Sequence, residues 1–440
     1  MTKRGKRWLI AGILSGVLLV VAASVLVVRH AIGRRRFTLG YREMNIQRYE
    51  AAIAAFTTAL QYPLGQQLRA YALGDRGYCR ARKQRNAEAL SDFDAALRLD
   101  QRLGFAYAER SRLRLGAGDT TGAWDDASRA ITLDPNAAIA LFTRATISRT
   151  RRQWDDAIRD YSEAIRAYPN YPEAYVHRAW AYERKNDAEH ALASLDAAIR
   201  TAPRYTEAYV QRGYYYEHEN EPEKALADFS EALKIAPQSM EVLLARARLL
   251  AGRNELAKAI ADYSSILQMK PIDEAALSER AVVYTWNGEY DRGIQDYTEL
   301  IRITQSRGAY ERRAGAALHA GKYQDALADY QTAAKLGGGD PTAKRLPWLL
   351  ATCPDATFRN GAEALRLALE DCERTGWKSW NCLDTAAAAS AETGDFKQAI
   401  AYEQQALRFA RFNGKRRELM EHRLALYKLG LPYRDAPRLR

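Results

Sequence analysis

The sequence predicts an all-α fold in which helical hairpins stack into a solenoid, preceded by one transmembrane helix. Two observations lead to this prediction. An apolar run occupies residues 8–28, and an arginine recurs every 34 residues from position 76 onward. A fixed period of this length is typical of stacked supersecondary units that each contact mainly their neighbours. The recurring arginines are Arg76, Arg110, Arg144, Arg178, Arg212, Arg246 and Arg280, followed one residue early by Arg313.

The N-terminal segment consists of a basic tail, residues 1–7, and an uncharged apolar run, residues 8–28. As a helix this run would span about 31 Å, which matches the roughly 30 Å hydrocarbon core of a membrane. A cleaved secretory signal is the alternative interpretation, because small residues precede Ser24 as at a cleavage site. The apolar run continues to Val28, which favours an uncleaved anchor.

The charges that flank the apolar run bear on its orientation. Four Lys or Arg residues precede the run and four follow soon after it, so the positive-inside rule is nearly balanced. A short tail with four positive charges is a poor candidate for translocation, so we expect the repeats outside the cytoplasm. Gly12 and Gly16 have the GxxxG spacing that packs membrane helices closely. A homodimer through these glycines is one interpretation, and ordinary helix glycines are the other.

Each repeated unit has the pattern of two amphipathic helices. With the recurring arginine as position 7, positions 8 and 20 hold small residues, such as Ala145 and Ala157. Position 24 is mostly bulky, as at Tyr161, and position 32 is often proline, as at Pro169. Small residues let paired helices approach closely, large residues fill the gap, and the proline ends the second helix.

This pattern resembles that of the tetratricopeptide repeat (TPR) family. The resemblance covers residues 33–340 as nine units, and it implies a right-handed superhelix whose concave side is lined by the first helix of each pair. The first unit departs most, because Leu39 and Ala55 stand where the other units have arginine and aspartate. The eighth unit lacks the terminal proline.

A series of aspartates accompanies the arginines. An aspartate stands 16 residues after each arginine except at Ser194, and the first unit lacks both residues. Because the two types are present and absent together, we expect partly buried ion pairs between the two helices of a unit. The predicted pairs are Arg76–Asp92, Arg110–Asp126, Arg144–Asp160, Arg212–Asp228, Arg246–Asp262, Arg280–Asp296 and Arg313–Asp329.

The net charge of +12 is concentrated at the two ends of the chain. Residues 1–36 carry a net charge of +8 and residues 414–440 carry +5, which leaves the repeats nearly neutral. A stack that binds nucleic acid is expected to carry the positive field itself. The charge distribution therefore argues against nucleic acid as a partner.

The sequence changes character beyond the repeats. Residues 341–413 resemble a degenerate TPR-like module found at the end of many bacterial TPR proteins, which suggests a bacterial inner membrane for the anchor. Residues 414–440 fit a capping helix and a basic tail that close the apolar end of the stack. The cysteines lack CxxC spacing, so no zinc site is expected. A disulfide between Cys353 and Cys372 is one interpretation outside the cytoplasm, and buried thiols are the other.

No catalytic or cofactor-binding motif stands out from the repeat, so we expect neither an enzyme nor a cofactor. The TPR resemblance implies a groove lined by position 9, which varies from unit to unit. We therefore predict a membrane-anchored scaffold that binds an extended or helical segment of another protein. The alternative is an accessory or regulatory subunit of an enzyme complex that acts through the C-terminal module. The candidate groove residues are Tyr78, Arg112, Thr146, Trp180, Tyr214 and Arg248.

Overall fold

The computed structural model describes the backbone of residues 3–336, 345–410 and 414–435, and side chains from residue 18 onward. Regular structure in these residues is helical throughout, and they contain no strand, which confirms the all-α prediction for this part of the chain. The chain divides into two compact units, Met1–Glu219 and Asn220–Arg440.

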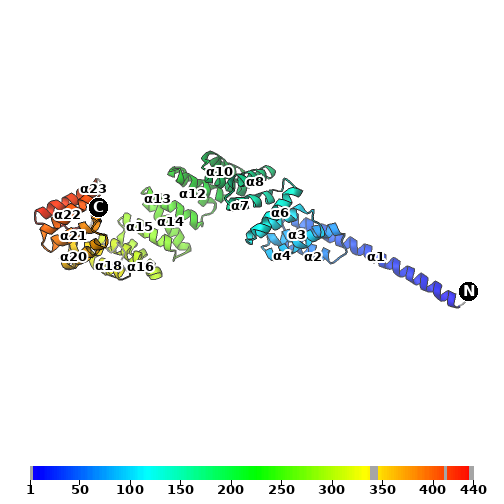
Figure 1. Cartoon of the computed structure of the whole chain (residues 1–440). Helices are drawn as coiled ribbons and strands as arrows, with labels where there is room; N and C mark the ends of the chain where they lie inside the picture. Colours follow the sequence, from blue (N-terminus) through cyan, green and yellow to red (C-terminus); the bar gives the residue numbers. More distant parts are fainter. Residues whose placement is uncertain (1–2, 337–344, 411–413, 436–440) are drawn as a thin grey trace. The chain divides into compact units, whose positions relative to one another are not determined.

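The first unit is a series of helix pairs joined by short turns (Figure 1). Each second helix packs on the first helix of its own pair and on that of the next pair. The helices are α1 (Lys3–Asn45), α2 (Tyr49–Leu60), α3 (Gln66–Arg82), α4 (Asn86–Leu99), α5 (Gly104–Gly116), α6 (Thr120–Leu133), α7 (Ala138–Thr150), α8 (Trp154–Ala167), α9 (Pro172–Arg184), α10 (Ala188–Thr201) and α11 (Thr206–His218).

The second unit continues the pattern through α18 and then adds the C-terminal module. The helices are α12 (Pro222–Ile235), α13 (Met240–Gly252), α14 (Leu256–Met269), α15 (Glu274–Trp286), α16 (Tyr290–Thr304), α17 (Arg307–His319), α18 (Tyr323–Leu336), α19 (Arg345–Thr352), the 3-10 helix η2 (Ala356–Phe358), α20 (Gly361–Arg374), α21 (Trp380–Glu392), α22 (Phe396–Phe409) and α23 (Lys415–Lys428). The boundary that the sequence predicts between the repeats and the C-terminal module, near residue 340, lies outside the described residues.

Helix α1 runs without interruption from Lys3 to Asn45, so one helix contains both the apolar run and the first helix of the first repeat. Two glycines in α1 allow its close packing on the first repeat. A Cβ atom at Gly40 would stand 2.7 Å from the ring of Phe56, and one at Gly33 would stand 2.9 Å from Tyr62 and Leu64. The C-terminal part of α1 thus packs on the first repeat as its first helix.

Within the described residues, no helix combines the length and the apolar character needed to cross a membrane. The first ten residues of the predicted membrane span, residues 8–17, have side chains that the structure does not describe. The predicted dimer contact at Gly12 and Gly16 falls in the same stretch.

Each helix pair turns through one left-handed residue at position 15 of the repeat. Gly118, Gly288 and Asn186 adopt this conformation at little cost, because glycine and asparagine tolerate positive φ. Gln84 and Arg152 adopt it too, with φ of 62° and 60°. In the eighth unit, which lacks the proline, α16 ends at a left-handed Gln305 with φ of 44°.

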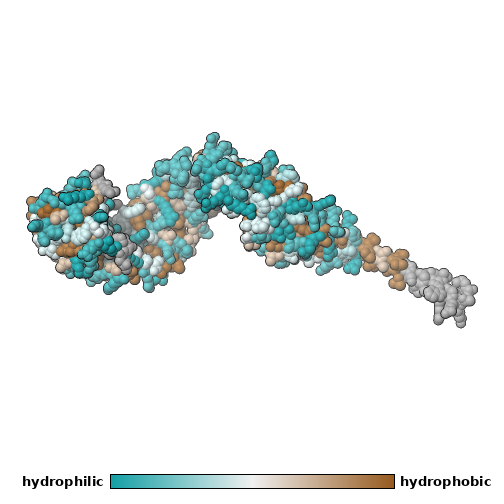
Figure 2. Space-filling view, in the orientation of Figure 1, coloured by the Kyte–Doolittle hydropathy of each residue, from teal (hydrophilic) through white to brown (hydrophobic). Residues whose placement is uncertain are grey.

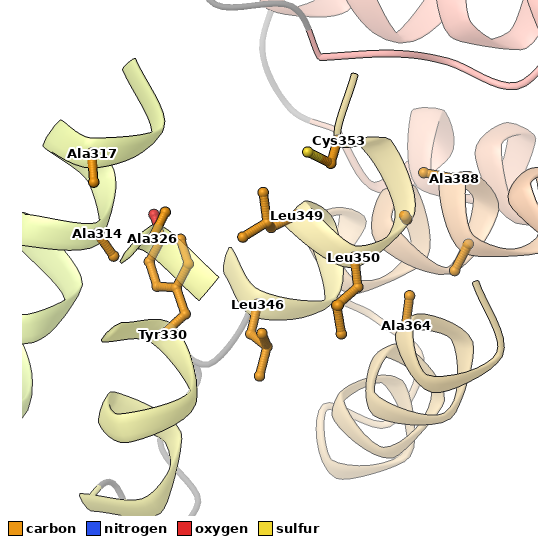
Figure 3. Packing of buried hydrophobic residues seen from close by; sticks show 12 residues of the cluster. Ala314, Ala317, Ala326, Tyr330, Leu346, Leu349, Leu350, Cys353, Ala364 and Ala388 are labelled. Atoms are coloured by element: carbon orange, nitrogen blue, oxygen red, sulfur yellow. The ribbon is translucent and has the colours of Figure 1, made fainter. Parts of the chain in front are cut away.

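Helix α19 links the last repeat to the C-terminal module through a buried apolar cluster (Figure 3). Leu346, Leu349 and Leu350 of α19 lie between Tyr330 of α18 and Ala364 of α20. Because α19 contacts α18, α20 and α21, the module packs directly on the repeats instead of hanging from a linker.

Candidate binding surfaces

The recurring arginine joins the two helices of its own unit. Arg144 Nε donates to Asp160 Oδ2 at 2.6 Å and its Nη2 donates to Oδ1 at 2.9 Å. The other predicted pairs have the same two-pronged geometry, with one exception. Arg212 and Asp228 belong to the same repeat but lie in different compact units, because the division between the compact units falls after Glu219, so their pair is not described. The remaining pairs are Arg76–Asp92, Arg110–Asp126, Arg246–Asp262, Arg280–Asp296 and Arg313–Asp329.

The same arginine also contacts the preceding unit, which the sequence analysis missed. Arg246 Nη1 donates to Ser230 Oγ at 3.1 Å, and Arg110 Nη1 donates to Asp94 Oδ1 at 2.6 Å. Both acceptors stand at position 25, where Asp, Ser or Thr recurs in most units. This recurrence at position 25 is the sequence feature from which the contact between successive repeats could have been predicted. These arginines therefore connect the two helices of a repeat and join that repeat to the preceding one.

In the compact unit Met1–Glu219, the first helices of successive pairs form one face. Helices α3 and α5, α5 and α7, α7 and α9, and α9 and α11 contact each other in turn. This face carries five of the six predicted groove residues, which all stand at position 9: Tyr78, Arg112, Thr146, Trp180 and Tyr214.

The structure places Trp180 and Tyr214 on one open pocket of about 450 Å³. Two guanidinium groups lie close to the indole of Trp180, with Arg149 at 4.8 Å and Arg184 at 4.9 Å from the ring centroid. Neither arginine forms an ion pair with another described residue. The pocket is lined by Trp180, Glu183, Arg184, Asn186, Ala188, Gln211, Tyr214, Tyr215, His218 and Glu219.

An aromatic cluster joins α7, α8 and α9, the last of which carries Trp180. The imidazole of His177 stacks on Tyr161 with ring centroids 5.9 Å apart, and Phe142 meets both rings at tilted or edge-to-face angles, 5.3 Å from His177 and 5.5 Å from Tyr161. Burial, with a smaller effect from Arg149, lowers the pKa of His177 to about 4, so this histidine is neutral at pH 7. Trp154 packs edge-to-face against Trp180, with ring centroids 5.5 Å apart. The Trp180 side chain is thus held in place by packing.

The other predicted groove residues are tied to neighbouring side chains. Arg112 Nη2 donates to Glu109 Oε2 at 2.8 Å, and Thr146 Oγ1 donates to the carbonyl of Phe142 at 2.8 Å. The ring of Tyr78 lies 6.4 Å from that of Tyr49. Arg248 belongs to the second unit, where its Nη2 donates to Glu279 Oε1 at 2.5 Å. Arg248 is therefore not placed relative to Trp180.

The C-terminal module contains a buried charged cluster that the sequence analysis did not single out. Arg423 of α23 donates two hydrogen bonds of 2.9 Å to Asp384 of α21. Glu403 of α22 is fully buried, and its Oε1 lies 3.6 Å from Arg423 Nε. Burial and the charge of Asp384 raise the pKa of Glu403 to about 10, so this carboxyl is neutral at pH 7.

The predicted disulfide between Cys353 and Cys372 is not formed. Both are buried free thiols, and they belong to different apolar clusters. The neighbour of Cys372 is Cys382, whose pKa is lowered to about 6 by hydrogen bonding from Cys372. Among the described residues, no group of His, Cys, Asp and Glu side chains is arranged to hold a metal ion.

The sequence profile of the tetratricopeptide repeat family matches residues 37–102, 109–172, 143–203, 176–240, 244–308 and 287–341. The chain belongs to the tetratricopeptide repeat family. TPR units are generally non-catalytic scaffolds for protein–protein interaction, which is the class of function that this membership supports. Comparison with curated proteins finds no significant match.

Solved TPR structures are similar to this TPR protein at a low level. A tetratricopeptide repeat protein from Parabacteroides merdae is 21% identical, covers 55% of this chain and 95% of its own, and gives a TM-score of 0.37. YrrB, described as a TPR protein with an unusual peptide-binding site, is 19% identical over 42% of this chain and 95% of its own, with a TM-score of 0.35. Yeast Tom70 is 14% identical over 90% of this chain and 96% of its own, with a TM-score of 0.37. The family assignment rests on the repeat match.

Proposed function

We propose that this TPR protein is a non-catalytic scaffold that binds a segment of another protein on the first-helix face around Trp180 and Tyr214. The observation that carries the proposal is the pocket of about 450 Å³ between α9 and α11, on which both aromatic side chains lie. Large aromatic and arginine side chains contribute most of the binding energy at protein interfaces.

The surroundings of Trp180 favour binding over a purely structural role. The indole of Trp180 together with Arg184, both on the pocket lining, offers an apolar surface beside a hydrogen-bond-donating cation. Trp154 packs edge-to-face against Trp180 with ring centroids 5.5 Å apart, so the indole loses less side-chain entropy when a partner docks. Glu183, Gln211 and the neighbouring polar groups form the polar rim that such interfaces have.

Photo-cross-linking tests the binding proposal. A photoreactive residue is placed at Tyr214, with a matched control at Tyr168, an aromatic residue that is exposed in the turn after α8. We expect the Tyr214 probe to capture one partner that the Tyr168 probe does not capture. In the same protein, Trp180→Ala should lower the yield of that adduct at least tenfold. An adduct of equal yield at both positions, or one insensitive to Trp180→Ala, would exclude this face as the binding site.

We also propose that residues 8–28 tether the scaffold to a membrane. Support comes from the part of α1 that precedes the first repeat, which is apolar and exposed from Leu18 to Val28 (Figure 2). Leu19 and Val27, for example, are 71% and 69% exposed. Burial of this surface in a bilayer would remove it from water.

Membrane extraction tests the tether. The full chain should stay in the membrane pellet at alkaline pH, and the double variant Leu19→Arg/Val27→Arg should move to the supernatant. Leu429→Arg, at another exposed apolar residue, is the matched control and should stay in the pellet. Release of the wild-type chain into the supernatant would contradict the proposal.

A further inference from the structure

The C-terminal module contains a second pocket, of about 440 Å³, which lies apart in sequence from the Trp180 face. It opens between α19, α21 and α23 within the second unit. Its volume is in the range of small-molecule sites, about 300–1,000 Å³. The lining residues are Arg345, Trp348, Trp380, Asn381, Asp384, Thr385, Arg416, Leu419 and Arg423.

The charge of this pocket is positive. Three of the lining residues are arginines and one, Asp384, is an acid. Asp384 is already bound by both prongs of Arg423 at 2.9 Å. The buried carboxyl behind this pair, Glu403, is neutral at pH 7 because its pKa is raised to about 10. The lining itself therefore carries more positive than negative charge.

The arginines at the pocket differ in accessibility. Arg423 is buried and holds the floor together, whereas Arg345 and Arg416 are exposed at the rim. Arg345 forms no ion pair with another described residue. Guanidinium groups match carboxylate and phosphate oxygens in planar, two-pronged geometry, so a rim of this kind favours an anionic group.

Two tryptophans supply flat apolar walls. Trp348 is fixed by its Nε1, which donates to Asp435 Oδ2 at 2.8 Å, and by Arg423, which lies 5.3 Å from its ring centroid. The guanidinium of Arg416 lies 5.6 Å from the ring centroid of Trp380. Each wall thus stands next to a cation, which is the arrangement that accommodates a flat ring beside a negative charge.

Neutral hydrogen-bonding groups complete the lining. The hydroxyl of Thr385 donates to the carbonyl of Asn381 at 2.9 Å and keeps its lone pairs as acceptors. The side-chain amide of Asn381 makes no hydrogen bond with another described residue. Both residues are on α21, one turn apart, and can orient a polar substituent of a ligand.

We propose that this pocket binds a soluble small acid in which a carboxylate or phosphate is attached to an aromatic ring. The anion contacts Arg345 and Arg416, and the ring packs against Trp348 and Trp380. The site is independent of the protein-binding face, so the TPR protein has a ligand-binding function in addition to its scaffold function.

Calorimetric titration of the full chain with phenyl phosphate and with benzoate tests the proposal. Benzyl alcohol serves as the neutral ring and inorganic phosphate as the ringless anion. We expect at least one aromatic acid to bind at least tenfold more tightly than both of these probes, and its identity distinguishes a phosphate ligand from a carboxylate ligand. Binding should weaken as salt concentration rises, because the contact is ionic.

The variant Arg345→Gln/Arg416→Gln should reduce this affinity at least tenfold. Both side chains are exposed, so the variant should keep the helical circular dichroism and melting temperature of the wild type. Arg312→Gln, which alters a different pocket of the second unit, is the matched control and should bind like the wild type. The proposal is overturned if both aromatic acids bind no more tightly than benzyl alcohol, if phosphate alone binds equally well, or if the double variant keeps full affinity.

Discussion

Arg280 and Ser264, which belong to successive repeats, are joined by a hydrogen bond of 2.9 Å between Nη1 and Oγ. The Nε and Nη2 groups of the same guanidinium donate two hydrogen bonds of 2.8 Å to Asp296 of its own repeat. One side chain therefore fixes both the helix pair and the step to the preceding pair. In a solenoid, stability is approximately the sum of such intra-unit and neighbour terms.

Removal of the acid from one such pair should destabilise the chain. Asp160 is almost fully buried against Arg144, so Asp160→Ala leaves a desolvated guanidinium without its counter-charge. We expect a loss of roughly 2–4 kcal/mol in the free energy of unfolding. Asp156→Ala removes an exposed ion pair with Arg159 from the same helix and should cost less than about 0.5 kcal/mol. Urea denaturation of both variants measures the difference, and equal values would refute a structural role for the buried pair.

The sequence was sufficient to predict the ion pairs within units because arginine and aspartate vary together at a fixed spacing of 16 residues. It did not reveal the contact between Arg246 and Ser230, because a serine in a helix has many other uses. The sequence also did not reveal how α1 packs on the first repeat, since the close approach of Gly40 to Phe56 is a property of packing and not of helix propensity. The pocket of the C-terminal module was missed because Arg345 and Arg423 are 78 residues apart and lack a repeat to align them.

Restoration of the missing acid in the fifth unit should stabilise the chain. Arg178 Nε contacts only the hydroxyl of Ser194, at 3.2 Å, and burial lowers the pKa of this arginine. Ser194→Asp supplies the charge-assisted pair found in the other units. We expect a gain of about 1–3 kcal/mol, the range for hydrogen bonds to charged groups.

The neutral variant Ser194→Asn is the control for the restored pair, because it has nearly the same shape as aspartate without the charge. It should gain less than Ser194→Asp in thermal and urea denaturation. A loss of stability in Ser194→Asp, or an equal effect of both substitutions, would mean that this site has no room for the ion pair.

The pH dependence of stability should report the buried Glu403. Desolvation, and then the charge of Asp384, raise its pKa from 4.5 to about 10, whereas Arg423 opposes the shift and Tyr427 packs nearby. A carboxyl with a raised folded-state pKa is most favourable to folding below the unfolded value, and this contribution is lost as pH rises from about 4.5 towards 10. Glu403→Gln should therefore be neutral near pH 4 and stabilising by about 4–5 kcal/mol at pH 8. Glu418→Gln on the exposed side of α23 should show no such difference, and a pH-independent effect of Glu403→Gln would contradict the raised pKa.

The left-handed turn residue at position 15 gives opposite predictions for two units. Arg152 adopts φ of 60°, where a side chain costs roughly 1–2 kcal/mol and glycine costs nothing sterically. The greater unfolded-state entropy of glycine offsets part of this gain, so Arg152→Gly should stabilise the chain by about 0.5–1 kcal/mol. Gly118 adopts φ of 87° in the third unit, so Gly118→Ala should destabilise it by a similar amount. Both substitutions leave the buried core intact, since both residues are exposed, and melting temperatures of the two variants compare them directly. Shifts of the same sign would show that the backbone conformation at this position does not limit stability.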